Sequence, residues 1–125
     1  IMTDLGIADS AGRQASTLPY GIQRKLEIAR ALACSPKLLL LDEPAAGMND
    51  AETGELGDTI MRVRQDFDVT IILIEHHINL VMGICTKVVV MERGALLASG
   101  APHDIRDNPK VVAAYLGHHR KASRQ

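Results

Sequence analysis

Stretches with helical hydrophobic spacing alternate along the chain with short, wholly apolar runs. Between residues 20 and 35, apolar side chains recur on one helical face, with polar residues around them. Pro36 predicts that this helix ends at Ser35, because a proline disfavours helical geometry in the residue before it. Four leucines, residues 38–41, follow at once and predict a strand buried on both faces. The expected helical face is formed by Ile22, Leu26, Ala29 and Ala33.

A second helix and a second strand are predicted in the same order. Asn49 and Glu52 resemble a capping box with asparagine in place of the usual serine or threonine, so a helix is expected to begin there. Residues 69–74, Val-Thr-Ile-Ile-Leu-Ile, then predict another strand buried on both faces. Strand, helix, strand with apolar strands is the pattern of a parallel α/β sheet with a right-handed crossover. The expected apolar face of the second helix is Leu56, Ile60, Val63 and Phe67.

The last third of the chain predicts shorter elements. Residues 88–91 and 95–98 are expected to form a hairpin that turns through Arg93 and Gly94. Pro102 and Pro109 suit the first positions of two short helices. A third helix is expected to carry Ile78, Val81, Met82 and Cys85, and a last apolar face to carry Val112, Tyr115 and Leu116, closed by Gly117.

The predicted order of strands also indicates where polar side chains meet. Asp42 and Glu43 follow the first strand and His76 follows the second. Because open α/β sheets bind ligands beyond the carboxyl ends of their strands, we expect these three side chains to line one crevice. An acid directly after a buried strand suits Mg²⁺, a second acid can orient or deprotonate a water, and an imidazole can contact a phosphoryl group. Taken alone, Asp42 and Glu43 are equally consistent with polar residues that have no functional role, in a turn or at a helix start near the end of a strand.

Composition narrows the class of protein. The 125 residues fit one domain, and 46% hydrophobic and 23% charged residues are typical of a soluble globular protein. A formal net charge of −1 gives no broad field for nucleic acid, so no nucleic-acid partner is expected. Cys34 and Cys85 lack a CxxC partner and are expected to be buried thiols of a cytosolic protein. The adjacent His76 and His77 are expected to point apart, which argues against a zinc site.

Four motifs, in order and spacing, resemble the series found in the ATPases of ABC transporters. They are Leu-Pro-Tyr-Gly-Ile-Gln-Arg at residues 18–24, Leu-Leu-Leu-Leu-Asp-Glu-Pro at 38–44, Ala-Gly-Met-Asn at 46–49 and Ile-Glu-His at 74–76. In that family they are the signature motif, the Walker B strand, the D-loop and the switch histidine. Residues 19–21, 45–49, 74–83 and 115–117 resemble most closely the ATP-binding subunits of branched-chain amino-acid importers. The resemblance implies a P-loop NTPase-like parallel sheet with flanking helices, followed by a β-hairpin and short helices.

The same resemblance implies a role for each matching residue. Asp42 would bind Mg²⁺, Glu43 would be the general base for the hydrolytic water, and His76 would bear on the γ-phosphate of ATP. The signature residues and the D-loop asparagine would lie at the nucleotide of a second ATPase subunit, because the family sandwiches two nucleotides between head-to-tail domains. Pro19 stands where the commonest signature has serine, and no physical account is found for His77, where aspartate is more usual. These cofactor-binding residues are Leu18, Pro19, Tyr20, Gly21, Ile22, Gln23 and Asn49.

No G-x-x-x-x-G-K-[ST] phosphate-binding loop occurs in the 125 residues, so this chain alone is expected neither to bind ATP tightly nor to hydrolyse it. The resemblance implies the carboxy-terminal part of an ABC ATPase domain. Residues 1–35 would end its helical subdomain, 36–101 would form the core with Walker B, D-loop and switch histidine, and 102–125 would form terminal helices and a tail. The whole protein would drive transmembrane permease subunits from the cytoplasmic face of the cell membrane.

Two alternatives to an importer ATPase stay open at this point. The chain could be a non-catalytic binding or regulatory module, in which this half of the domain works without nucleotide. It could also belong to the ATPase of a related exporter of the lipopolysaccharide type, which shares a similar Tyr-Leu-Gly ending. The Pro-Tyr-Gly signature and the Val-Met-Gly stretch at residues 81–83 favour the importer over that exporter.

Overall fold

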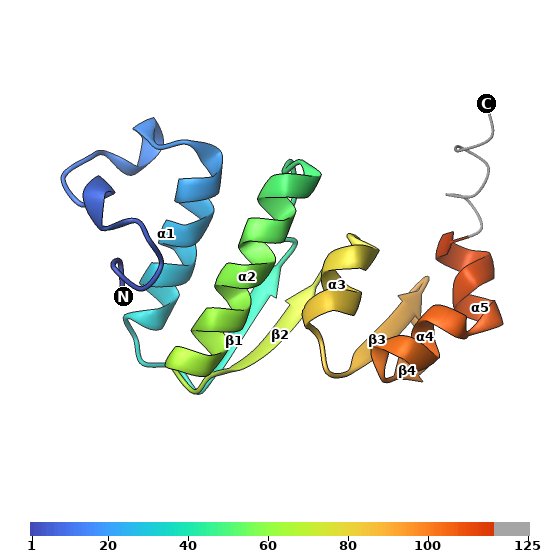
Figure 1. The fold of residues 1–125 in the computed structure, drawn as a ribbon. Coiled ribbons are helices and arrows are strands. Elements are labelled where there is room, and N and C mark those ends of the chain that lie inside the picture. Colours follow the sequence, from blue (N-terminus) through green and yellow to red (C-terminus); the bar gives the residue numbers. More distant parts are fainter. Residues whose placement is uncertain (117–125) are drawn as a thin grey trace, which may run out of the picture. The chain divides into compact units, whose positions relative to one another are not determined.

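The computed structural model describes residues 1–116, and Gly117, expected to close the last apolar face, lies outside the described residues. The chain divides into two compact units, Ile1–Leu80 and Val81–Gln125. The helix α3 (Ile78–Ile84) contains the boundary between them. Figure 1 shows the elements of both units in chain order. Within the described residues, no helix has the length and the apolar character to cross a membrane.

The first unit is built on two parallel strands. Two 3-10 turns, η1 (Ala8–Ser10) and η2 (Ala15–Thr17), precede the helix α1 (Tyr20–Leu32). The strand β1 (Leu38–Asp42), the helix α2 (Asp50–Asp66) and the strand β2 (Thr70–Ile74) follow. β1 and β2 pair in parallel from Leu38 opposite Thr70 to Asp42 opposite Ile74, which confirms the predicted α/β arrangement. The two helices of this unit lie side by side (Figure 1).

The buried face of α1 differs from the predicted one. Its buried residues are Ile28, Ala29 and Leu32, so only Ala29 is shared with the expected stripe. Ile22 and Leu26 are half-buried, because the face that packs inward is centred on the carboxy-terminal half of the helix. The helix also ends earlier than predicted, at Leu32.

The end of α1 leaves one of the cysteines in solvent. Ser35 has a φ of 49°, a left-handed conformation that a helix cannot contain. Cys34 lies in the turn before it and is exposed, so the prediction of two buried thiols was wrong for this residue. Cys34 is exposed because α1 ends at Leu32, two residues before it.

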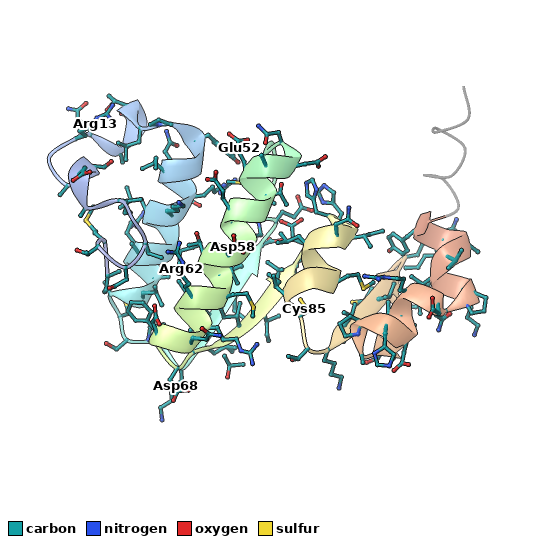
Figure 2. The ribbon with its side chains drawn as sticks, in the orientation of Figure 1. Arg13, Glu52, Asp58, Arg62, Asp68 and Cys85 are labelled. Carbon is teal, nitrogen blue, oxygen red and sulfur yellow. The ribbon has the colours of Figure 1, made fainter. Side chains whose placement is uncertain are left out.

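The helix α2 begins as predicted. The Asn49 side chain accepts a hydrogen bond from the Glu52 amide at 2.9 Å, and the Glu52 carboxylate accepts one from the Asn49 amide at 2.9 Å. This is a complete capping box, and Figure 2 labels Glu52 at the start of the helix. The predicted apolar face is buried at Leu56, Ile60 and Val63, while Phe67 is half-buried at the end of the helix.

Burial of the strands on both faces was predicted wrongly for this chain. Leu39 of β1 is 5% exposed, whereas Leu40 beside it is 66% exposed. Successive side chains of a strand point to opposite faces, and only the face that carries Leu39 is covered within the first unit. The other face is formed by four exposed apolar side chains: Leu38, Leu40, Ile72 and Ile74.

The second unit contains the predicted hairpin. β3 (Val88–Glu92) and β4 (Ala95–Gly100) are antiparallel and slightly longer than expected, with a register shift between Val90 and Met91. Arg93 and Gly94 have φ values of 50° and 80°. Positive φ at both central residues is the requirement of a type I′ turn, so the turn chemistry was correctly predicted.

Short helices complete the second unit. α4 (Pro102–Asp107) and α5 (Pro109–Val111) begin at the two predicted prolines, and a π-helical turn, η3 (Val112–Leu116), follows. The Tyr115 hydroxyl donates a hydrogen bond to the Met91 carbonyl of β3. Figure 2 labels Cys85, which is half-buried just after α3. The core of the unit is Val88, Ile105 and Val111, with Val81, Met82, Cys85, Val90, Leu97 and Ala98 packed against it.

Candidate functional site

The predicted meeting of polar side chains occurs at the carboxyl ends of β1 and β2. Asp42 is the last residue of β1 and lies opposite Ile74, the last residue of β2. The Glu43 amide then donates a hydrogen bond to the Ile74 carbonyl at 2.8 Å. The Oε1 atom of Glu43 lies 3.7 Å from Nδ1 of His76, and these side chains are 54% and 62% exposed. Glu43 and His76 therefore contact each other, and Asp42 directly precedes Glu43 in the chain.

The backbone of Glu43 is unusual. Its φ of 45° lies in the left-handed region, where side chains other than glycine are uncommon. A tight turn follows, in which the Ala46 amide donates to the Glu43 carbonyl at 3.1 Å and the Met48 amide to the Ala45 carbonyl at 3.1 Å. Backbone strain of this kind clusters at functional sites and persists where neighbouring contacts fix the conformation. β1 thus ends directly before Glu43, the predicted general base.

The two histidines after β2 do not point apart as expected. Their ring centroids are 5.0 Å apart with an interplanar angle of 28°, so His76 and His77 are stacked. Strand alternation does not apply to them, because β2 ends at Ile74 and both lie in the turn before α3.

Asp42 is suited to binding a divalent cation that takes most of its ligands from water and phosphate. Over residues 1–116, no three His, Cys, Asp or Glu side chains gather closely enough to hold a metal ion by themselves. Mg²⁺ is commonly held by only one or two carboxylates, together with waters and substrate phosphates. A single exposed carboxylate at a strand end, as Asp42 is, suits that manner of binding.

The segment before α1 is held in place by its own residues. Pro19 is the N-cap position of the helix, and its carbonyl accepts hydrogen bonds from the Ile22 and Gln23 amides at 2.9 and 3.0 Å. The Gln23 side chain donates to the carbonyl of the buried Leu18 at 2.8 Å. A Cβ added to Gly21 would meet no atom within 4 Å, so the space beside this glycine is open.

Tyr20 links this segment to the loop after β1. The Arg24 guanidinium lies 4.9 Å from the centroid of the Tyr20 ring and donates hydrogen bonds to its hydroxyl. Arg24 also pairs with Glu27 at 2.7 Å, and this hydrogen bond raises the pKa of Arg24. A Cβ built on Gly47, whose φ is 78°, would lie 3.9 Å from Cε1 of Tyr20. The start of α1 therefore lies against the loop of residues 46–49.

Other predicted site residues are not brought to the Glu43–His76 pair. The Asn49 side chain is engaged in the cap of α2. Among residues 1–116, no hydrogen bond or ion pair joins the segment 18–23 to Glu43 or His76.

Glu75 makes contacts that its place in the sequence motif did not indicate. One oxygen of its carboxylate accepts a hydrogen bond from the Ala45 amide at 2.8 Å. The other accepts from the His76 amide at 3.1 Å and from the His77 amide at 3.4 Å. The available signal was an acid next to the histidine, and nothing local to the sequence indicated a partner thirty residues away.

Comparison with family models and curated proteins identifies relatives over most of the chain. Residues 1–46 match the model described as ABC transporter, and residues 95–121 match that of the branched-chain amino acid ATP-binding cassette transporter. The branched-chain amino acid transport ATP-binding protein LivG of Salmonella typhimurium is 51% identical over 90% of this chain and 44% of its own length. BraF of Pseudomonas aeruginosa is 49% identical over 93% of this chain and 46% of its own length.

Solved structures agree with the sequence comparison. The ADP conformation of MJ1267, an ATP-binding cassette of an ABC transporter, superposes with a TM-score of 0.83 at 28% identity, over 93% of this chain and 47% of that one. CbiO1 from Clostridium perfringens gives a TM-score of 0.81 at 26% identity, over 96% of this chain and 50% of that one. The chain thus spans about half the length of the relatives it matches. It belongs to the ABC transporter family of ATP-binding subunits, within the branched-chain amino acid type.

Proposed function

We propose that these residues form the part of an ATP-binding subunit that completes the hydrolytic site of an ABC importer for branched-chain amino acids. The observation that carries the proposal is the approach of Glu43 to His76, 3.7 Å apart, beside Asp42 at neighbouring strand ends. The solute class rests on the relatives, because LivG and BraF carry branched-chain amino acid transport in their names. Residues 1–35, 36–101 and 102–125 are assigned as the end of the helical subdomain, the catalytic core and the terminal helices.

Each strand-end residue has one task in this proposal. The family binds nucleotide, typically with Mg²⁺, and the bound nucleotide supplies the phosphoryl group to be transferred to water. Asp42 would hold the metal through its exposed carboxylate. Glu43 would accept a proton from the attacking water. Its carboxylate is exposed, so a water molecule has room beside it. His76, whose Nδ1 lies 3.7 Å from the Glu43 carboxylate, would hydrogen-bond the phosphoryl oxygens that gain charge.

The start of α1 is proposed to bind a phosphate of the nucleotide held by a second ATPase subunit. The first amides of a helix lack intrahelical acceptors, and the helix dipole favours an anion there. Here the first helical residues are Tyr20 and Gly21, and the space beside Gly21 is open. Pro19 has no hydroxyl to contribute, so this contact depends on backbone amides.

The remaining partners follow from the same family. We propose a second ATPase subunit across the nucleotide, and transmembrane permease subunits that carry the solute, with no role for nucleic acid. The subunit would lie on the cytoplasmic face of the membrane, bound to the permease. The stretch of residues 46–50, which contains Asn49, would pass between the two sites and couple them.

The proposal is tested with the full-length subunit that carries these residues, assembled with its permease. Glu43→Gln keeps the size of the side chain and removes the base, so ATP hydrolysis should fall about 10²–10⁴-fold. His76→Ala should lower hydrolysis and uptake of leucine into vesicles together. The matched control is Glu55→Gln, an exposed carboxylate on α2. Hydrolysis by Glu43→Gln within twofold of the unaltered subunit would contradict the proposal.

A further inference from the structure

The carboxylate of Glu75 joins two segments of chain that carry the proposed catalytic pair. On one side it accepts the Ala45 amide at 2.8 Å, within the turn that begins at Glu43. On the other side it accepts the amides of His76 and His77 at 3.1 and 3.4 Å. A single side chain therefore fixes the backbone on both sides of the Glu43–His76 contact.

The Ala45 amide has a strong need for this partner. Ala45 is 0% exposed, so water does not satisfy its N–H group. Buried backbone amides are nearly always hydrogen-bonded, and the acceptor of this one is the side chain of Glu75. Loss of the carboxylate would leave a buried donor unpaired at the centre of the turn. The turn would be expected to rearrange so that this amide reaches water or another acceptor.

Such a rearrangement would act on Glu43 directly. Glu43 is two residues before Ala45, and its φ of 45° is held by the hydrogen bond from its amide to the Ile74 carbonyl at 2.8 Å. His76 follows Glu75 in the chain and shares the same carboxylate through its amide. Both members of the pair therefore move if the turn relaxes. Misplacement of a reacting group by about 1 Å can lower a rate about 10²-fold.

We propose that Glu75 is a positioning residue, which holds Glu43 and His76 at their mutual distance through backbone hydrogen bonds to both segments. This inference rests on the proposed function, because the pair it positions is the proposed hydrolytic pair. Glu75 itself has no part in proton transfer. A carboxylate suits the task because its two oxygens accept three amides from two segments.

The test compares Glu75→Ala and Glu75→Gln with Glu43→Gln and the control Glu55→Gln in the full-length subunit with its permease. Glu75→Ala should lower kcat for ATP hydrolysis about 10–100-fold and leave KM for ATP within about twofold, because nucleotide binding does not use this carboxylate. Glu75→Gln keeps one acceptor oxygen and should recover part of the loss. Deuterium exchange of the peptide that contains Ala45 should be faster in Glu75→Ala, and unchanged in Glu55→Gln.

The outcomes separate this inference from the proposed function. An unchanged kcat in Glu75→Ala, with hydrolysis lost in Glu43→Gln, refutes the positioning role and leaves the proposed function standing. Activity retained in Glu43→Gln refutes both. An equal loss in kcat and gain in KM, with a lower Tm, would show general destabilisation and also refute positioning. If Glu75→Ala does not fold, Glu75→Gln carries the test, with a smaller fall in kcat and faster exchange at Ala45 expected.

Discussion

Replacing Thr53 by valine should stabilise the protein, whereas the same replacement at Thr59 should destabilise it. Both threonines lie on α2 and both are buried, with 8% and 1% of their surface exposed. They differ in the fate of the hydroxyl group. Oγ1 of Thr59 donates a hydrogen bond to the Glu55 carbonyl at 2.9 Å, while Oγ1 of Thr53 has no partner among the described residues. The two substitutions therefore compare a hydrogen-bonded with an unpaired hydroxyl group within one helix.

The magnitudes follow from the state of each hydroxyl. A buried hydroxyl without a hydrogen bond costs about 1–3 kcal/mol, so its replacement by a methyl group of similar shape should gain about 1 kcal/mol. At Thr59 a satisfied hydrogen bond is lost, which costs about 0.5–1 kcal/mol net. Valine and threonine are both β-branched and have similar helix propensity, so the backbone contribution is nearly equal. The two variants should therefore differ by about 1.5–2 kcal/mol.

Thermal unfolding of the full-length subunit measures this difference. In a protein of about 150–250 residues, 1 kcal/mol shifts Tm by about 2–4 °C, so Thr53→Val should melt about 3–8 °C above Thr59→Val. Thr53→Ser serves as a control, because it keeps the unpaired hydroxyl and removes only a methyl group; it should lower Tm. If Thr53→Val melts below the unaltered protein, the reasoning from the unpaired hydroxyl is refuted.

Two further predictions concern the second unit and the turn after α1. Burial raises the pKa of the Cys85 thiol, so at pH 8 this residue holds less thiolate than an exposed cysteine and should react with a maleimide at least about tenfold more slowly than the exposed Cys34. Its labelling rate should keep rising as the pH is raised to 9, and equal rates for the two thiols at pH 8 would contradict this. Gly94→Ala should destabilise the protein by about 1–2 kcal/mol, because φ is 80° there although no atom within 4 Å would obstruct a Cβ. Gly94→Asn should lose less stability, because asparagine tolerates a positive φ better than alanine. If denaturant unfolding shows the alanine variant to be more stable than the asparagine variant, the backbone conformation is not the cause of the destabilisation.

Local chemistry explains which features could be predicted from sequence. The capping box at Asn49 and the type I′ turn at Arg93 and Gly94 depend on residues close together in the chain. The contact of Glu43 with His76 is not local, yet it was predictable because parallel strands place their carboxyl ends at one edge. The family resemblance added the expected roles of the site residues, and those roles stay predictions.

Features that depend on the surroundings could not be predicted. Apolar side chains cover more than one face of α1, so the spacing alone does not decide that Ile28 and Leu32 pack inward while Ile22 stays half-buried. A run of leucines is equally compatible with covering one face or both, and here Leu39 is buried while Leu40 is exposed. In both cases the outcome is set by which element packs against the segment, and neither periodicity nor composition specifies that element.

The turn after β1 joins these two kinds of information. A left-handed backbone conformation in a residue other than glycine costs about 1–2 kcal/mol of conformational free energy. Glu43, the proposed base, has this conformation. Two of the hydrogen bonds that hold the turn come from the end of β2: the Ile74 carbonyl binds the Glu43 amide, and the Glu75 carboxylate binds the Ala45 amide. The geometry of the first strand end therefore depends on the second, which also carries His76. Because hydrogen bonds from Glu43 and Ala45 join the two segments, the proposed acid–histidine pair is best understood as one folded unit made from two distant parts of the sequence.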